Sequence, residues 1–509
     1  MLSKIFTCAV LGLESQLIEL ETAISAHFPG FFMVGLPDKA IEESKERVNL
    51  AIKNSGFNFP RSKVTINLAP ADLHKEGTGY DLPIALGILL ASSQIQIPDL
   101  EKSLFVGELA LDGKLRHTNG VLPIAIFAKE NNFEKIFIPQ ADVAEASLVH
   151  GIQIYPIASL QDLVNFFIQQ KNIQPITAGL NDKNLIEDPD LKYEYDMAYV
   201  KGQEQAKRAL EIAAAGGHNV RMSGPPGSGK TMLARAMTSI LPTMTADESL
   251  EVTKIYSVAG LLSPQKPLIN QRPFRSPHHT SSGVALVGGG QVPKPGEITL
   301  AHRGVLFLDE FPEFPRTVLE NLRQPLEDGV ITISRAKASY TFPARVTLIA
   351  SQNPCPCGYY GDPYHECTCS PGQVIKYQKK ISGPLLDRID LHIEVPRVKI
   401  EKLTSDQVAE PSVEIRQRVQ RARDLQSQRY KGLNIFTNSE LGAKQIREFC
   451  QLNSEAQQLL NSALQQLHLS ARGYHRTLKV ARTIADLNQQ DEIQSEHIAE
   501  ALQYREKAE

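Results

Sequence analysis

Residues 224–231 read GPPGSGKT and match the phosphate-binding P-loop pattern G-x-x-x-x-G-K-[ST] at every fixed position. The preceding HNVRMS is typical of a buried strand and the following MLARAMTSIL of a helix, which is the context the motif requires. A chance glycine-rich turn is the alternative, and the complete pattern with both flanks disfavours it. In such a loop the Lys contacts the β- and γ-phosphates and the Thr ligates Mg²⁺. The residues predicted to bind ATP are Gly224, Pro225, Pro226, Gly227, Ser228, Gly229, Lys230 and Thr231.

A second half of a nucleotide site follows in GVLFLDE, residues 304–310, a run of buried-strand residues that ends in two acids. At the end of such a strand Asp309 would hold Mg²⁺ together with Thr231, and Glu310 would polarise the attacking water. An apolar strand before Asp-Glu is common in α/β proteins, so the P-loop upstream is what makes this pair informative. The chain between the two motifs is longer than one strand–helix–strand unit needs, which predicts an insertion.

The composition is that of a globular protein and excludes few functions. With 509 residues the chain should hold about three domains. Its formal net charge is −3, so a nucleic-acid contact has to come from a local basic surface. No apolar run is long enough to span a membrane, and the acids Glu14, Glu19 and Glu21 disfavour a signal peptide. Six cysteines in so long a chain argue against a disulfide scaffold, and we expect a cytoplasmic location.

The pattern of apolar and polar residues divides the chain into four parts. Residues 1–168 alternate strand and helix patterns, which predicts an α/β domain. Residues 169–197 are polar and contain Pro175, Gly179 and Pro189, so they are interpreted as a linker. Residues 198–398 are predicted to form an α/β core around the P-loop, and residues 399–509 a helical lid.

Long segments resemble the magnesium-chelatase-like ComM/YifB family of AAA+ ATPases. They include RPFRSPHHTSSGVALVGGG (272–290), SQNPCPCG (351–358), SGPLLDRIDLHIEV (382–395) and, near the N-terminus, NLAPADLHKEGTGYDLPIALG (67–87). The resemblance covers nearly the whole chain. It implies a homo-hexameric ring ATPase and, for bacterial members, a DNA branch-migration motor in natural transformation.

The resemblance also assigns roles to polar residues outside the two motifs. Asn353, at the end of the apolar strand RVTLIAS, matches the sensor-1 position, where it can hold the attacking water or the γ-phosphate. Arg388 matches an arginine finger that reaches into the neighbouring subunit; the alternative is a surface ion network with the acids beside it. Arg472 is the choice for sensor 2 and Arg476 the second choice, with a solvated basic helix face as the alternative.

The predicted insertion contains GGG before Lys294. After the acid pair, residues 329–349 predict two strands around RAKAS, a hairpin placed just before Asn353. Arg335 and Lys337 at the tip of this hairpin can track a DNA backbone in a ring pore; two ordinary turn cations are the alternative. His278 and His279 have no acidic or cysteine residue at ligand spacing nearby in the sequence, so we expect no metal there.

Four cysteines, Cys355, Cys357, Cys367 and Cys369, form a C-x-C-x₉-C-x-C pattern. Four thiolates can close a tetrahedral Zn²⁺ site, although C-x-C is tighter than the usual spacing. Buried free thiols and a redox switch are the alternatives. His365 lies between the pairs and is a possible substitute ligand.

Residues 1–168 resemble the Lon-protease proteolytic fold, but the catalytic groups are missing. The matching segments place Gly79 where the nucleophile would stand and Ile124 near the position of the catalytic Lys. Amide cleavage by a Ser–Lys pair needs a hydroxyl and an amine, so we expect a structural or substrate-binding domain.

The sequence thus favours an ATP- and Mg²⁺-dependent motor that acts on branched or single-stranded DNA, with Zn²⁺ as a second metal. A metal-chelatase motor subunit and a protein-remodelling ATPase remain as alternatives. The first is disfavoured by the Lon-like domain and the cysteines.

Overall fold

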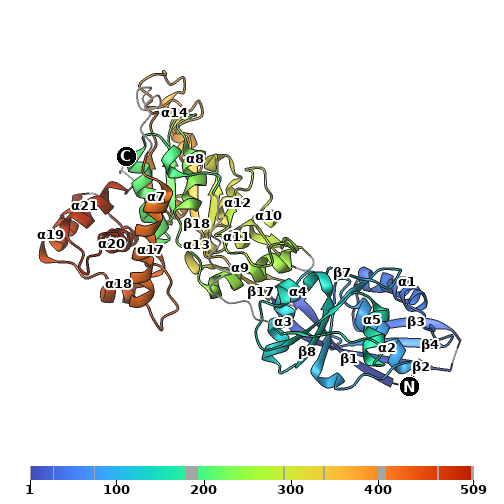
Figure 1. Ribbon diagram of the computed structural model, residues 1–509. Coiled ribbons are helices and arrows are strands. Elements are labelled where there is room, and N and C mark those ends of the chain that lie inside the picture. Colours follow the sequence, from blue (N-terminus) through green and yellow to red (C-terminus); the bar gives the residue numbers. More distant parts are fainter. Residues whose placement is uncertain are drawn as a thin grey trace. The chain divides into compact units, whose positions relative to one another are not determined.

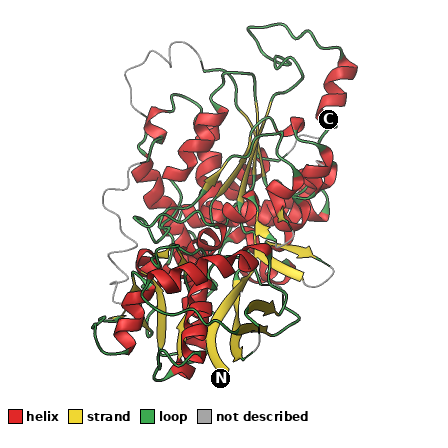
Figure 2. Cartoon of the chain, turned by 90° about the vertical axis from the view of Figure 1, so that its right-hand side faces the viewer, coloured by secondary structure: helices red, strands yellow, loops and turns green. Residues whose placement is uncertain are grey.

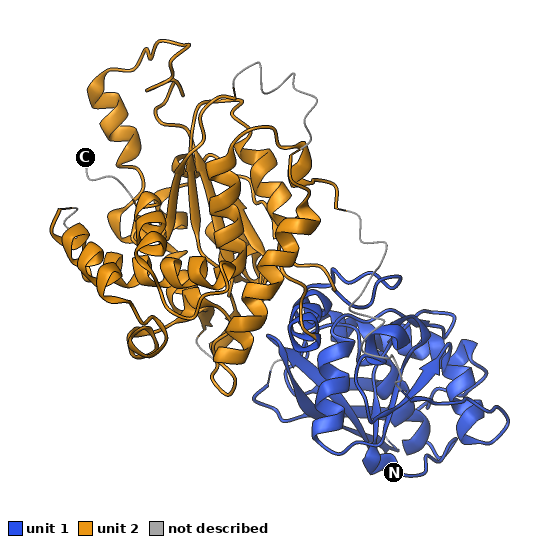
Figure 3. Cartoon of the chain, turned by 60° about the vertical axis from the view of Figure 1, so that its left-hand side comes forward, with its two compact units in different colours: residues 1–187, 246–269 blue, residues 188–245, 270–509 orange. Residues whose placement is uncertain are grey.

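The computed structural model describes residues 2–26, 28–73, 75–177, 193–290, 293–335, 339–398, 409–466 and 469–505. The chain divides into two compact units, one of residues 1–187 and 246–269 and the other of residues 188–245 and 270–509 (Figure 3). Both units combine helices with strands, which confirms the predicted α/β class. Residues 178–192, within the predicted linker, lie outside the described residues.

Two four-stranded sheets build the first unit. One has the order β1-β2-β4-β3 (Leu2–Leu11, Glu14–Ser25, Lys63–Ala69, Gly30–Val34) and the other β10-β9-β8-β5 (Ile176–Thr177, Gln153–Ile157, Lys135–Pro139, Ser103–Phe105). Strand β4 alternates buried and half-buried residues, the period-two pattern of a strand with one face in a core. Its helices are α1 (Lys39–Asn54), α2 (Asp81–Ala91), α3 (Val121–Glu130), α4 (Val143–Ala146) and α5 (Leu160–Phe167).

Helix α9 (Ala246–Ala259) belongs to the first unit although its sequence lies within the predicted core of the second. Leu250 packs against the apolar core that α3 helps to form. The hydroxyl of Ser257 donates to Glu145 Oε1 at 2.5 Å, and both side chains are buried. The chain therefore leaves the second unit after the P-loop helix and returns to it at residue 270.

A five-stranded parallel sheet forms the centre of the second unit, in the order β12-β15-β18-β11-β19. The strands are Phe274–Arg275, Val305–Leu308, Thr347–Gln352, Val220–Ser223 and Leu391–Glu394. All residues of β15 and β18 are buried, as expected for parallel strands covered on both faces, and helices flank the sheet (Figure 2). Because the strands are parallel, their carboxyl ends gather the loops that follow them at one edge.

Short elements carry the insertions of this unit. They are α10 (Gly283–Val287), the pair β13 (Gly288–Gly289) and β14 (Lys294–Pro295), α11 (Glu297–Leu300), α12 (Arg316–Glu320), α13 (Arg323–Asp328), α14 (Pro371–Gln378) and α15 (Gly383–Leu386). Strands β16 (Val330–Ser334) and β17 (Ser339–Pro343) pair in antiparallel register and confirm the predicted hairpin.

The end of the chain is helical, as predicted. Helices α17 (Ser412–Arg429), α18 (Ala443–Phe449), α19 (Ser454–Gln466), α20 (Ala471–Leu487) and α21 (Ser495–Gln503) gather together (Figure 1) and pack with α7 (Glu204–Gly216) on one core. Buried Asp486 links three elements of this lid. It accepts from Arg429 at 2.6 and 3.0 Å, from Arg482 at 3.1 Å and from Asn438 at 2.8 Å.

Candidate active site

The P-loop lies between β11 and α8 (Lys230–Ala236), as its sequence predicts. Gly227 and Gly229 have φ of 75° and 91°, a left-handed conformation that glycine adopts without strain. Lys230 Nζ donates to the carbonyl oxygens of Gly224 and Pro225 at 2.7 and 2.9 Å. Burial lowers the pKa of this ammonium, and Asp309 opposes the shift. The P-loop thus holds the buried ammonium group of Lys230 against its own backbone carbonyl groups.

The predicted Mg²⁺ ligands meet at the carboxyl end of the sheet. Thr231 Oγ1 donates to Asp309 Oδ2 at 3.0 Å, and the hydroxyl of Ser351 donates to Asp309 Oδ1. Ser351 belongs to β18, next to the strand that ends before Asp309. A hydroxyl and a carboxylate side by side are oxygen donors suited to Mg²⁺. The sequence prediction named Thr231 and Asp309 but missed Ser351, which no local pattern marks.

Glu310 follows Asp309 in a left-handed backbone conformation with φ of 51°. Its N–H donates to Asp309 Oδ1 at 3.0 Å, and its side chain is 56% exposed. His279 Nδ1 lies 3.4 Å from Glu310 Oε2. Neither histidine has an acidic residue at ligand spacing in the sequence, and the contact arises because Glu310 follows strand β15 on a distant segment.

Asn353 directly follows β18 and reaches the P-loop. Its Oδ1 accepts from Lys230 Nζ at 3.3 Å. Strand β18 lies between β15 and β11, so the residue after it stands between the acid pair and the P-loop. This is the position from which a sensor-1 side chain can contact the γ-phosphate.

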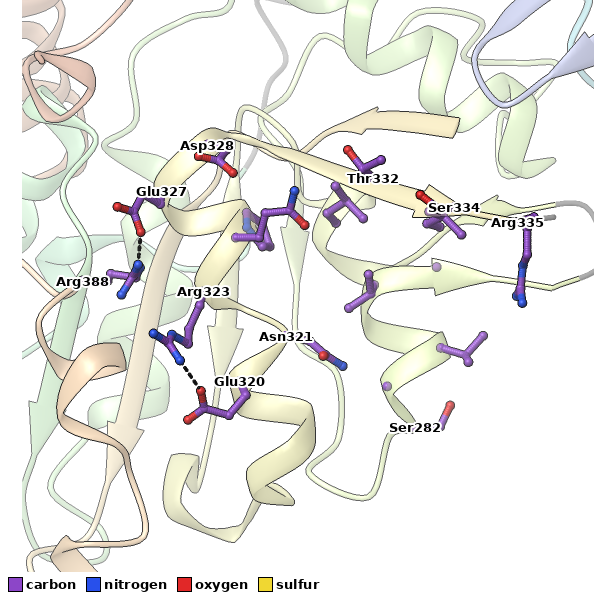
Figure 4. Close-up of a pocket in the computed structure, with 18 residues that line it drawn as sticks. Ser282, Glu320, Asn321, Arg323, Glu327, Asp328, Thr332, Ser334, Arg335 and Arg388 are labelled. Atoms are coloured by element: carbon purple, nitrogen blue, oxygen red, sulfur yellow. Dashed lines mark hydrogen bonds and ion pairs between the residues drawn. The ribbon is translucent and has the colours of Figure 1, made fainter. Parts of the chain in front are cut away.

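Arg388 lies apart from this cluster and lines a groove of about 990 Å³ (Figure 4). Arg388 pairs with Glu327 of α13, not with Asp387 or Asp390, and Arg472 lies 3.9 Å from the same carboxylate. Arg476 instead pairs with Asp390 at 3.5 Å. In the described part of the chain neither Arg388 nor Arg472 forms a hydrogen bond or ion pair with the P-loop.

Arginine and acidic side chains face one another in this groove. Arg388 is only 10% exposed, and its pKa is lowered by burial and then by the nearby arginines 323, 472 and 476. Glu320, a second acid of the groove, pairs with Arg323 at 2.9 Å. The groove therefore presents guanidinium groups that acidic side chains of the same chain hold in place.

The four cysteines of the C-x-C-x₉-C-x-C pattern come together. Sγ of Cys355 lies 3.3 Å from that of Cys357 and 3.7 Å from that of Cys367, and all four sulfurs lie within 4.8 Å of one another. A tetrahedral zinc site with Zn–S of about 2.3 Å places its sulfurs about 3.8 Å apart. A hydrogen bond from the Tyr359 backbone lowers the pKa of Cys357 to about 5. Against a hydrogen bond from the Cys369 backbone, burial and the neighbouring thiols raise the pKa of Cys367 to about 12.

The loop that carries these cysteines packs on the P-loop. A side-chain carbon built on Gly358 would lie 2.7 Å from Pro226 Cδ, so the backbone at Gly358 packs directly against the Pro226 ring. His365 is not among the converging ligands; its ring stacks on Tyr359 with centroids 5.0 Å apart. The cysteine cluster thus fits a tetrahedral metal and stands beside the nucleotide site.

Three family models match this chain, and so do several known proteins. Residues 196–403 match the family described as magnesium chelatase, subunit ChlI, residues 20–142 match subunit ChlI of Mg-chelatase, and residues 409–505 match its C-terminal part. The chain is 45% identical to the competence protein ComM of Haemophilus influenzae over 508 residues, covering 99% of this chain and 97% of ComM. It is 44% identical to YifB of Escherichia coli over 511 residues, covering 99% and 97%. A match to the magnesium-chelatase subunit ChlI of Cyanophora paradoxa is 24% identical and covers 58% of this chain and 84% of that subunit.

The chain belongs to the ComM/YifB family of magnesium-chelatase-like AAA+ proteins. Members of this family are ATPases, and the assembled P-loop, acid pair and Asn353 fit that activity with ATP and Mg²⁺. In the described residues no helix is long and apolar enough to cross a membrane.

The structure also bears on the predicted DNA-contacting residues of the hairpin and on the missing protease residues of the first unit. Arg335 is exposed at the end of β16 beside the hairpin tip, whereas Lys337 lies outside the described residues. In the first unit Gly79 precedes α2 and Ile124 is buried in α3, so neither position offers a hydroxyl or an amine.

Proposed function

We propose that this protein is a cytoplasmic hexameric ring ATPase that acts on branched or single-stranded DNA as a branch-migration helicase in natural transformation. The observation that carries the proposal is the β16–β17 hairpin. It presents Arg335 near its tip, and β17 leads within a few residues into β18, which ends beside Asn353. A DNA contact at the tip of the hairpin could therefore be transmitted through β17 and β18 to Asn353, which accepts a hydrogen bond from Lys230.

A ring is required by the proposed role of Arg388. An arginine finger stabilises the transition state of a neighbouring subunit, and Arg388 makes no contact with the P-loop of its own chain in the described residues. Arg472 lies beside the same acid, Glu327, and we propose it as sensor 2. Both guanidinium groups would then act at the border between two subunits.

We also propose that Cys355, Cys357, Cys367 and Cys369 hold one structural Zn²⁺. The sulfur distances and the converging thiols support this donor set. A metal there would fix the loop that follows Asn353 and packs on Pro226.

The relatives support the DNA motor over the alternatives. A protein named for competence matches this chain over its full length, whereas the chelatase subunit ChlI matches 58% of it. Protein remodelling remains the alternative, because it does not require the protease catalytic residues that are missing from this chain.

The test is the steady-state ATPase rate with a four-way junction, single-stranded DNA, a porphyrin or casein. We expect DNA alone to stimulate hydrolysis, and the junction to be resolved with ATP but not with a non-hydrolysable analogue. Stimulation by casein and by no DNA would replace the DNA motor with a protein remodeller.

Charge-reversal variants locate the contact. Arg335→Glu and Lys337→Glu should weaken stimulation and flatten its salt dependence while basal hydrolysis persists. Lys431→Glu, an exposed lysine beyond α17, is the matched control and should behave as wild type. Equal loss in all three variants would argue against a hairpin contact.

A further inference from the structure

The segment between β12 and α10 brings an imidazole to the acid pair. Strand β12 pairs in parallel with β15, so the chain leaving β12 passes the residues that follow β15. In this way His279, which belongs to neither the P-loop nor the acid strand, places Nδ1 at 3.4 Å from Glu310 Oε2. The contact joins residues that are thirty-one positions apart in the numbering.

The ring of His279 is held by its neighbours. It lies against the ring of His278 with centroids 4.1 Å apart, and Phe314 approaches edge-on at 6.4 Å. Nδ1 of His278 lies 2.9 Å from Thr280 Oγ1 instead. Of the two histidines only His279 therefore has a ring nitrogen in contact with the Glu310 carboxylate.

Glu310 has a fixed backbone and an exposed side chain. Its N–H bonds Asp309 and its carbonyl accepts from the Glu313 N–H at 2.7 Å, whereas the carboxylate is 56% exposed. A general base works only within hydrogen-bond reach of the proton it removes. The orientation of this carboxylate is therefore a property that a neighbouring donor can control.

We propose that His279 is a positioning residue for Glu310. Its Nδ1–H donates to Oε2 and leaves Oε1 free to accept a proton from water. The water oxygen bonds the γ-phosphorus as the bond to the β–γ bridging oxygen breaks, the proton passes to Glu310, and ADP and phosphate leave. His279 thus acts on the rate of hydrolysis and not on nucleotide affinity. This inference rests on the proposed role of Glu310 but not on DNA as the partner.

The test compares full-length variants under single-turnover conditions, with nucleotide affinity measured alongside. His279→Ala should lower the hydrolysis rate by roughly tenfold at unchanged ATP affinity. His279→Gln retains a donor and should recover much of the loss. His278→Phe keeps the ring that packs on His279 and should stay close to wild type.

Adding His279→Ala to a Glu310→Gln variant distinguishes a positioning role of His279 from a general structural role. Glu310→Gln and the double variant Glu310→Gln with His279→Ala should hydrolyse ATP at the same rate, because the second change has no base left to orient. A tenfold further loss in the double variant, or a His279→Ala rate within twofold of wild type, would overturn the proposal. If the wild-type protein hydrolysed ATP at a rate that DNA did not change, the DNA-motor proposal would fail and this inference would stand.

Discussion

Arg388 forms an ion pair with Glu327, which lies on α13 of the same chain, sixty-one residues earlier. The pair stands at the groove of Figure 4, where Glu327 also faces Arg472. Burial and then arginines 323, 472 and 476 lower the pKa of Arg388, and Glu327 is the acid that pairs with it. The arginine proposed to act on a neighbouring subunit is thus oriented by an acid of its own chain.

Glu327→Gln is expected to lower ATP turnover by roughly tenfold, because Arg388 loses the anion that orients it. Nucleotide binding should be unaffected, since the P-loop is unchanged. Glu320→Gln, which removes the acid paired with Arg323 in the same groove, is the matched control and should retain most activity. Equal turnover of the two variants would show that Glu327 does not orient the finger.

Arg388→Ala and Glu310→Gln subunits, each inactive alone, are expected to recover part of the hydrolysis when mixed. A mixed ring contains interfaces at which an intact Glu310 faces an intact Arg388. The measurement is the ATPase rate against mixing ratio in rings whose assembly is checked by light scattering. Fully assembled mixed rings without any rescue would argue against action between subunits.

Lys230→Ala is expected to abolish nucleotide binding, because it removes the cation at the centre of the P-loop. Glu310→Gln should bind ATP and retain it, because only the activation of water is lost. Fluorescent-nucleotide titration and the bound ATP-to-ADP ratio distinguish the two. If Glu310→Gln hydrolysed ATP at the wild-type rate, Glu310 would not be the residue that activates the attacking water.

Protein purified without a tag is expected to contain one Zn²⁺ per chain, measured by elemental analysis. Cys355→Ser should lose the metal, whereas Cys450→Ala, which changes a buried cysteine outside the cluster, should keep it. Because Gly358 packs on Pro226, loss of the metal should also weaken ATP binding. Four freely titrating thiols in metal-free native protein would exclude the site.

Asp486→Ala is expected to destabilise the lid by about 3–5 kcal/mol, because it leaves the buried charges of Arg429 and Arg482 without their acid. The urea midpoint followed by circular dichroism measures the effect. Glu492→Ala, an exposed acid in the same lid, should leave the midpoint unchanged.

The parts of the fold that the sequence predicted are those written in local patterns. The P-loop with its flanking strand and helix, the β16–β17 hairpin and the helical end of the chain each follow from contiguous residues. Parallel pairing of β15 with β18 then brings Asp309 and Ser351 together without any further information.

The missed features are contacts between distant segments. The sequence offered the acids beside Arg388 as its alternative partners, but Arg388, which follows the short helix α15, pairs with Glu327 on the distant helix α13. His279 looked isolated because Glu310 reaches it only through the β12–β15 pairing. The sequence of helix α9 predicts a helix, but it does not indicate against which of the two units the helix packs.

The excursion of residues 246–269 into the first unit has a consequence for how the protein can be dissected. A fragment ending at residue 187 would lack α9, leaving the α3 core without Leu250 and Glu145 without the Ser257 hydroxyl. A fragment starting at residue 188 would instead expose the buried face of α9, including Val252 and Ile255, to water. Truncation at the linker is therefore expected to give two insoluble halves, and the N-terminal unit is not a detachable module but part of one interwoven polypeptide.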